Sequence, residues 1–300
     1  MSKLSIDLKK NYSVYLLFTP ALLFYIIFCY IPMGGLIIAF MNYNPARGIF
    51  RSNWVGLKYF IEFFKSMFFF RLMRNTLMLN VYDIIFGFPV PILLALILNE
   101  IINTKFKAII QTILYMPYFL SLVVLCGIII TFTSTEGVIN DLISIFGFKR
   151  TNLLMEVNLF KPIFIISNIW QWAGWSSIVY VAALMGIDPE LYDAAYVDGC
   201  GRFRRLLHVS LPGIMPVIII MLILRLGNLM SVGFEKVILL YNPLVMETAD
   251  VISSYVYRRG LLEANYSFAT AVGFFNSILN FGFLWFANRL SRKVSEYSLW

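Results

Sequence analysis

The chain has 300 residues, of which 60% are hydrophobic and 13% charged, and its mean hydropathy is +0.79. This composition is too apolar for a soluble domain and predicts a protein that crosses a membrane several times. The formal net charge of +8 does not indicate nucleic acid, because the basic residues are scattered through loops between apolar runs. There they are expected to contact anionic lipid, so we expect membrane lipid and no nucleic acid among the partners.

Apolar runs of about 20 residues are long enough to cross a hydrocarbon core of about 30 Å. The first run follows a short basic N-terminus at residues 1–13, and Pro20 and Pro32 are expected to kink it. The sequence therefore predicts an all-α membrane protein, with residues 14–300 forming one transmembrane domain. Its six predicted spans lie at about residues 14–40, 76–98, 110–131, 162–185, 213–233 and 268–287.

Two segments between the spans are mixed in character. Residues 42–75 combine a turn signal, NYNPARG, with a stretch in which aromatic and basic residues alternate. This pattern predicts an interfacial helix before the second span, although a packed extramembrane helix fits equally well. Residues 134–148, in the loop after the third span, are typical of a short amphipathic helix.

The longest charged interruption of the apolar pattern is residues 190–212, ELYDAAYVDGCGRFRRLLHVSLP. Asp188 is a good N-cap and Pro189 suits the first helical position, so a short helix is expected to begin there. Gly199 and Gly201 are expected to end this helix. A basic helical part then follows, and Pro212 is expected to turn the chain into the fifth span.

The spacing within this loop resembles the integral-membrane permease subunits of binding-protein-dependent ABC importers. Their signature is Glu-Ala-Ala, three residues, Gly, nine residues, Ile, one residue and Leu-Pro. Here Asp replaces the usual Glu and Val replaces the usual Ile. The matching residues are Asp193, Ala194, Ala195, Gly199, Val209, Leu211 and Pro212.

In that family the loop is a cytoplasmic coupling helix, which docks on the ATPase between the antepenultimate and penultimate spans. Residues 186–212, between spans four and five of six, have the matching position. Residues 194 and 195 are alanines, so the helix is able to approach a partner closely. By resemblance, the residues expected to couple to the ATPase are Glu190, Asp193, Ala194, Ala195, Asp198, Gly199 and Pro212.

The resemblance also implies partners and a location. It implies a second homologous permease subunit, two ATPase subunits that hold ATP and Mg, and an extracellular solute-binding protein. It places the chain in the plasma (inner) membrane of a prokaryote with both termini cytoplasmic. Lysine and arginine are almost equally frequent on the two sides, so the basic residues alone do not decide this orientation.

Several segments are similar to the branch that imports polysaccharides or oligosaccharides. They are GFEKVILLYNP, YVYRRGL, YSFATAVGFFNS and the ending SEYSLW. The resemblance therefore implies a carbohydrate substrate, with a non-sugar solute as the alternative. Residues 235–242 are expected to lie in an outer loop that meets the binding protein.

Candidate residues of the substrate pathway come from the polar positions within spans. One helical face of span four combines amides with indoles, which suits sugar hydroxyls and ring faces, although interhelical packing is the alternative. Span six carries a face of small and polar residues that packing also explains. The candidates on these two faces are Asn168, Gln171, Trp172, Trp175 and Asn276.

Ionisable residues within spans are rare and often functional. Asp83 in span two and Arg225 in span five are the deepest in this chain. Either the two pair with each other, or Arg225 with Asn228 faces a water-filled cavity and contacts substrate, particularly an acidic one. The sequence alone does not decide between these alternatives.

Motifs for catalysis are missing from the sequence. It has no GxxxxGK[ST], HExxH or GxSxG, and its three cysteines have no metal-like spacing. We therefore expect no enzyme activity and no cofactor on this chain. Two other classes remain as alternatives, a stand-alone channel or secondary carrier and a membrane enzyme.

Overall fold

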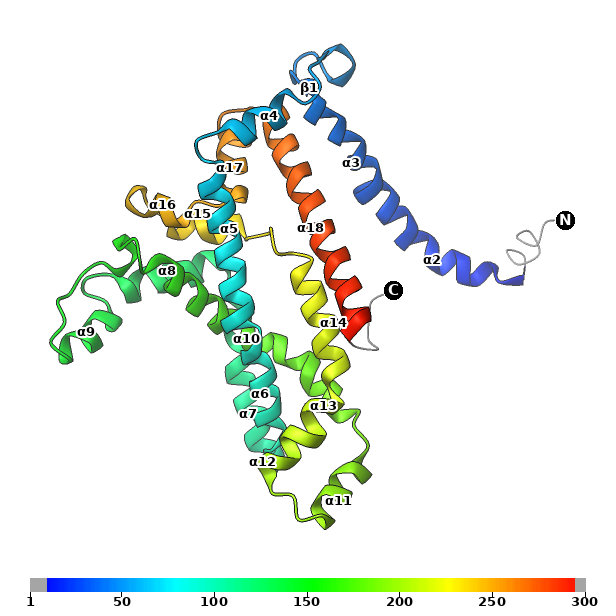
Figure 1. Cartoon of the computed structure of the whole chain (residues 1–300), viewed down its shortest axis with the longest axis vertical. Coiled ribbons are helices and arrows are strands. Elements are labelled where there is room, and N and C mark those ends of the chain that lie inside the picture. Colours follow the sequence, from blue (N-terminus) through cyan, green and yellow to red (C-terminus); the bar gives the residue numbers. More distant parts are fainter. Residues whose placement is uncertain (1–9, 295–300) are drawn as a thin grey trace. The chain divides into compact units, whose positions relative to one another are not determined.

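The computed structural model describes residues 10–294, which are predominantly helical (Figure 1). The ending SEYSLW, on which part of the family resemblance rests, and most of the N-terminus expected to be cytoplasmic lie outside these residues. The chain divides into two compact units, which we describe separately. Unit 1 comprises residues 1–65 and 258–275, and unit 2 comprises residues 66–257 and 276–300. Short segments of 3-10 or π-helix are labelled η.

Unit 1 begins with a continuous helix of 29 residues, Tyr12–Phe40, which is long and apolar enough to cross a membrane. Its π-helical turn η1 lies between the two prolines, where Pro32 offers no N–H to the helical ladder. None of the side chains in α2, η1 or α3 is buried. The parts of this helix are α2 (Tyr12–Tyr25), η1 (Ile26–Tyr30), α3 (Ile31–Met33) and η2 (Gly34–Phe40).

The rest of unit 1 forms a small aromatic core. Strands β1 (Met41–Asn42) and β2 (Asn53–Trp54) pair antiparallel, after which α4 (Lys58–Lys65) follows. Helix α4 buries Tyr59 and Phe63, one turn apart, and Phe63 contacts Phe268 and Phe275 edge-on. The predicted amphipathic helix therefore exists, and it packs on its own unit. The remaining elements are η3 (Ile49–Arg51), η9 (Arg258–Leu262) and the first part of α18 (Tyr266–Val294).

Unit 2 holds the other long helices, including α10 (Phe160–Met185), which packs along α6 and α7 (Figure 1). The segments before α10 are α5 (Phe69–Tyr82), η4 (Asp83–Gly87), α6 (Pro89–Asn99), α7 (Thr104–Tyr115), η5 (Met116–Phe119), α8 (Leu122–Thr133), α9 (Val138–Ile145) and η6 (Leu153–Met155). Those after it are α11 (Pro189–Val197), α12 (Arg202–Arg205), η7 (Leu206–Ser210), α13 (Leu211–Gly213), α14 (Met215–Leu226), α15 (Phe234–Leu240), η8 (Pro243–Val245), α16 (Met246–Ala249), α17 (Ile252–Tyr257) and the end of α18.

Within residues 10–294, four helices are long and apolar enough to cross a membrane, or five if the bent pair α12–α13 and α14 is one span. Three of the four helices correspond to predicted spans one, two and six, and the bent pair corresponds to predicted span five. The fourth helix, Leu122–Ile145, overlaps only the second half of predicted span three. Helix α10 has 26 residues and matches predicted span four in its bounds, but it is less apolar.

Three predicted boundaries were wrong. The second span begins at Phe69, because residues 69–75 continue the helix instead of belonging to the interfacial segment. The third run is broken after Tyr115, where Pro117 opens a 3-10 turn and Ser121 caps a new helix. The fifth helix ends at Leu226, and its bend of 60° follows Gly213, not Pro212.

Close backbone approach holds α10 against α7. A Cβ added at Gly174 would lie only 2.0 Å from the carbonyl oxygen of Leu114, so only glycine fits there.

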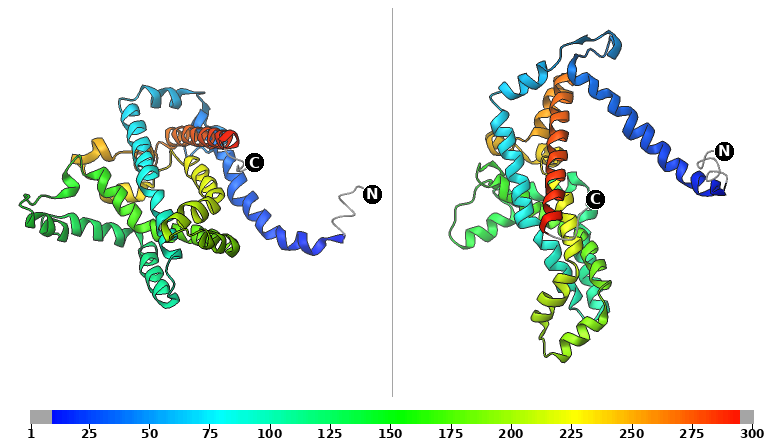
Figure 2. Two further views of the ribbon diagram at one scale, coloured as in Figure 1. Left: turned by 60° about the horizontal axis from the view of Figure 1, so that its bottom comes forward. Right: turned by 45° about the vertical axis from the view of Figure 1, so that its right-hand side comes forward.

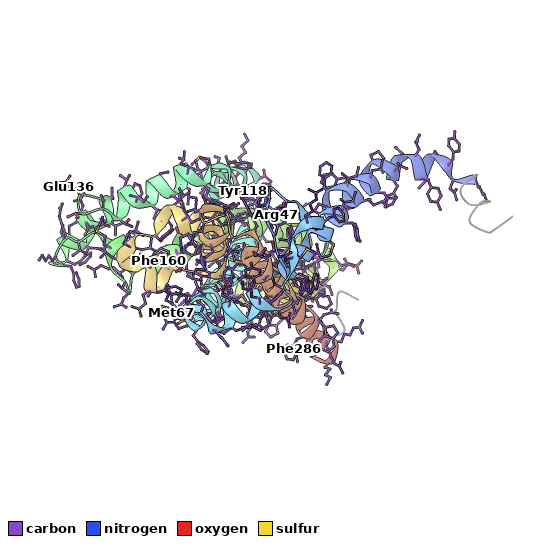
Figure 3. The ribbon with its side chains drawn as sticks, turned by 90° about the horizontal axis from the view of Figure 1, so that it is seen from above. Arg47, Met67, Tyr118, Glu136, Phe160 and Phe286 are labelled. Carbon is purple, nitrogen blue, oxygen red and sulfur yellow. The ribbon has the colours of Figure 1, made fainter. Side chains whose placement is uncertain are left out.

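The amphipathic segment after α8 also forms a helix as predicted, namely α9. Figure 3 shows Glu136 at the outer tip of the turn between α8 and α9, whereas Phe160, at the start of α10, is buried within unit 2.

Polar contacts fix the start of α5 against the turn between α16 and α17. Asn75 Nδ2 donates to the carbonyl oxygens of Glu247, at 2.8 Å, and of Asp250, at 3.0 Å. The Asp250 carboxylate is 3.4 Å from Arg71 and accepts a hydrogen bond from Ser254. These bonds satisfy buried groups and position the loop that follows α15.

Candidate functional site

Unit 2 contains a cavity of about 570 Å³, which is lined by side chains from α5, η4, α6, α10, α14 and α15. It brings together seven of the eight residues predicted for the substrate pathway. The exception is Asn276, which lies on α18 and does not line the cavity. The seven are Asp83, Asn168, Gln171, Trp172, Trp175, Arg225 and Asn228.

An ion pair spans this cavity. Arg225 Nη2 pairs with Asp83 Oδ2, while Asn168 Nδ2 donates to Asp83 Oδ1 at 2.7 Å. Asp83 is 6% exposed, so both partners are needed to offset the cost of burying its charge. A Cβ on Gly87 would lie 3.0 Å from Asp83 Oδ1, so the π-helical segment η4 leaves just enough room for the carboxylate. Of the two sequence alternatives for Arg225, pairing with Asp83 is confirmed.

One wall of the cavity is aromatic. Trp172 and Trp175 line it from α10, and the ring of Tyr118 stacks on Trp175 with centroids 4.3 Å apart and planes 2° apart. Tyr118 also meets Trp172 edge-on at 5.1 Å. Because Tyr118 orders the two indoles and both remain more than a third exposed, ring area stays available to a ligand.

The amides of the cavity have different surroundings. Gln171 is buried on α10, whereas Asn228 lies beyond the end of α14 and donates to the carbonyl oxygen of Leu224 at 3.1 Å. The segment after Asn228 is fixed by Asn280, which accepts from Met230 N and donates to Ser231. The end of α14 is therefore held in place although its helix is shorter than predicted.

Lys236 also lines the cavity, although no pattern in the sequence singled it out. It lies on α15, is 5% exposed, and its Nζ sits 5.1 Å from the centroid of the Phe164 ring. No hydrogen-bond acceptor for this Nζ occurs among residues 10–294. Burial lowers the pKa of Lys236 to about 8. The only signal in the sequence was one lysine inside the apolar run FEKVILL, which we expected to form an outer loop.

The predicted coupling loop lies at one end of unit 2, with α11 beyond α12 and α13 (Figures 1 and 2). Asp188 caps α11 by accepting from Glu190 N at 3.0 Å, and Pro189 occupies the first helical position, as predicted. Gly199 has φ +73, and Cys200 N donates to Ala195 O while Gly199 N donates to Tyr196 O. This Schellman motif ends the helix where the sequence predicted.

Two contacts attach the loop to the rest of unit 2. The hydroxyls of Tyr192 and Ser210 are 3.1 Å apart, and Arg205 lies 3.5 Å from Glu100 at the end of α6. Ala195 is buried, whereas Ala194 and Leu191 are exposed on α11. The loop is therefore attached at these two points, and most residues of α11 remain exposed.

None of the predicted coupling residues lines the cavity. Within the residues that the structure describes, no three His, Cys, Asp or Glu side chains lie close enough together to hold a metal ion. The two features are thus separate: a cavity with aromatic, amide and charged walls, and a capped helix at one end of the same unit.

Residues 87–296 match the family described as binding-protein-dependent transport system inner membrane component. The polygalacturonan/rhamnogalacturonan transport system permease protein YteP of Bacillus subtilis (strain 168) is 42% identical over 99% of this chain and 93% of its own length. Protein LplB of the same organism is 43% identical over 97% and 92%.

Two solved structures are similar over nearly the whole chain. One is a bacterial ABC transporter involved in the import of the acidic polysaccharide alginate, with a TM-score of 0.88 and 43% identity over 98% of this chain and 99% of the other. The second is a bacterial alginate ABC transporter in complex with alginate pentasaccharide-bound periplasmic protein, with a TM-score of 0.90 and 42% identity over 99% and 100%. The chain belongs to the family of binding-protein-dependent transport system inner membrane components.

Proposed function

We propose that the chain is the permease subunit of an ATP-driven ABC importer and that it carries an oligosaccharide or polysaccharide across the membrane. The observation that carries this proposal is the cavity of unit 2. Its wall combines exposed faces of Trp172 and Trp175 with amides, the arrangement that binds sugar rings by stacking and sugar hydroxyls by hydrogen bonds.

The relatives support a carbohydrate that carries negative charge. YteP is named for polygalacturonan and rhamnogalacturonan, and the two solved transporters are described with alginate, an acidic polysaccharide. The cavity volume of about 570 Å³ lies within the usual range of small-molecule binding pockets. A non-sugar solute is the alternative that an uptake assay separates from this one.

The energy comes from partner subunits in this account. Two ATPase subunits bind ATP and Mg, a second homologous permease completes the pathway, and an extracellular solute-binding protein delivers the substrate. The exposed side of α11, with Leu191 and Ala194, is the proposed docking surface. The capped ends of α11, its contact to Ser210 and the contact of Arg205 on α12 to Glu100 favour rigid transmission of movement.

The mechanism proposed is alternating access. Closure of the ATPases on ATP moves α11, and the movement passes through α12 and η7 to α14, which carries Arg225 into the cavity wall. Residues Glu190, Asp193, Asp198, Gly199 and Pro212 then shape or orient this loop. No step of the cycle requires bond chemistry on this chain.

We further propose six spans with both termini cytoplasmic in the inner membrane of a prokaryote. Helix α10 is added to the four apolar helices and the bent pair, since its 26 residues extend about 39 Å at 1.5 Å per residue. The single permease domain of residues 14–300 and the coupling loop of residues 186–212 remain part of this proposal.

Co-purification tests the assignment. Expressed together with its proposed partner subunits, the tagged chain is expected to recover ATPase subunits in fixed proportion. Ala194→Trp places a large side chain on the proposed docking surface and is expected to remove them. Ala46→Trp, at another exposed alanine in the turn between β1 and β2, is the matched control and is expected to retain them. Recovery of ATPase by both variants alike would contradict the docking role.

A further inference from the structure

Lys236 has an unusual position for a lysine. Its side chain is 95% buried, since only 5% is exposed, and its ammonium lies over the Phe164 ring without a hydrogen-bond acceptor among the described residues. Burying an ammonium without an anionic partner costs free energy, and natural proteins keep such groups mainly where they serve a function. The contact with Phe164 offsets part of this cost.

Lys236 is also one of the residues that line the cavity of unit 2. Three other charged residues line the cavity: Asp83 and Arg225, which are paired with each other, and Glu235. Glu235 is the neighbour of Lys236 along α15, and consecutive helical residues do not face each other. Lys236 is therefore a cation at the cavity wall whose three N–H donors have no acceptor in the part of the chain that is described.

We propose that Lys236 binds a carboxylate of the transported sugar and selects acidic over neutral carbohydrates. This inference rests on the proposed function. A uronate carboxylate supplies the missing acceptor in the form of a charge-assisted hydrogen bond, while the exposed indoles of Trp172 and Trp175 accept the sugar rings. Arg225 does not take this role, because its guanidinium is engaged by Asp83.

The protonation state of the amine agrees with this role. Burial lowers the pKa of Lys236 to about 8, so the group is still mostly charged near neutral pH. A bound carboxylate would favour the charged form further. The buried amine of Lys236 is thus unfavourable in the empty site and gains its missing acceptor when a carboxylate binds. A residue with this property favours acidic over neutral ligands.

Uptake by the complete transporter tests the proposal. The chain, its partner permease, ATPases and binding protein are reconstituted in vesicles, and uptake is measured with trigalacturonate and trimannuronate as acidic probes and galactotriose as the neutral probe. Lys236→Met removes the charge but retains length and the contact with Phe164, and Lys236→Arg retains the charge. We expect Lys236→Met to lower acidic uptake at least tenfold and Lys236→Arg to keep it within about threefold.

The stability of the purified complex gives a second readout. A merely structural lysine would lower the melting temperature when it is replaced, whereas removal of an unsatisfied buried amine is expected to leave the melting temperature unchanged or raise it. If Lys236→Met fails to assemble with its partners, Lys236→Gln is measured instead, with the same loss of acidic uptake expected.

The outcomes separate this inference from the proposed function. Acidic uptake at the wild-type rate in Lys236→Met, or uptake of galactotriose alone by the wild type, would overturn the role of Lys236 and leave a carbohydrate permease. Uptake of none of the three probes by the wild type would contradict the proposed function itself.

Discussion

Arg225 on α14 forms an ion pair with Asp83 of η4, and Asn168 holds the second oxygen of the same carboxylate. Three separate helical segments therefore meet at one buried charge. Since α14 follows the coupling loop directly, this contact joins the proposed moving part of unit 2 to α10 and the aromatic wall of the cavity.

The first prediction concerns this ion pair. Arg225→Met leaves the Asp83 carboxylate with Asn168 as its only partner. This change is expected to lower the free energy of unfolding by about 2–3 kcal/mol, which is less than for a fully buried pair because Arg225 is half exposed. The double variant Arg225→Met with Asp83→Asn is expected to regain much of this stability, since it no longer buries an unpaired charge. Thermal unfolding of the purified complex measures both, and a double variant no more stable than Arg225→Met would contradict the pairing.

The second prediction concerns the approach of α7 to α10. Gly174→Ala places a methyl group against the Leu114 carbonyl, which backbone movement alone relieves, and is expected to destabilise the protein by about 1–3 kcal/mol. Gly282→Ala on α18 is the matched control, because nothing lies within 4 Å of its added Cβ. The control is expected to be neutral or slightly stabilising. Equal melting temperatures for the two variants would refute this packing.

The third prediction concerns the aromatic wall. Trp175→Ala removes the indole that stacks on Tyr118 and is expected to lower sugar uptake about three- to tenfold, which corresponds to about 0.5–1.5 kcal/mol of lost ring contact. Trp175→Phe retains a ring and is expected to keep most of the uptake. Phe160→Leu, in the core away from the cavity, controls for lost stability. The ring contact would be excluded by wild-type uptake in Trp175→Ala.

The fourth prediction concerns pH. With the pKa of Lys236 near 8, its charged fraction falls about tenfold between pH 7 and pH 9, so uptake of the acidic probes is expected to fall about tenfold. Lys236→Arg stays charged and is expected to show a much flatter profile. Other titratable groups nearby are shared by both proteins and cancel in the comparison; on the packed segments they are Cys126, Glu235, Asp83, Arg225, Tyr255 and Tyr257. Parallel profiles would count against Lys236.

The buried amine of Lys236 also makes the free energy of unfolding depend on pH. The pKa of Lys236 is lower in the folded protein than its ordinary value of 10.5, so between pH 8 and 10.5 the unfolded chain binds more protons. The free energy of unfolding is therefore expected to rise with pH in this window as the buried amine loses its charge. Lys236→Met is expected to lose that rise in a thermal unfolding series.

Much of the helical pattern was predictable from the sequence, because local chemistry determines it. The cap at Asp188 and the left-handed Gly199 bound α11 as expected, since a side-chain oxygen and a glycine act within a few residues. The face of α10 that carries Asn168 and Trp172 followed from helical periodicity alone.

The rest depended on contacts distant in sequence. Apolar length suggested one third span, but Pro117 and Ser121 divide it, and hydropathy does not record such a break. We expected Lys236 to lie in an outer loop, but it is buried against Phe164. That burial depends on a residue distant in sequence, so the neighbours of Lys236 in the chain did not indicate it. Whether Asp83 and Arg225 pair likewise depended on how α14 packs.

The most direct test of the account is uptake of labelled trigalacturonate by vesicles that contain the complete transporter and its binding protein. We predict uptake that requires ATP, the ATPase subunits and the binding protein together, and that Ala194→Trp abolishes while Ala46→Trp retains it. Uptake by the purified chain in vesicles without any ATPase would show a stand-alone channel or carrier and would contradict the account.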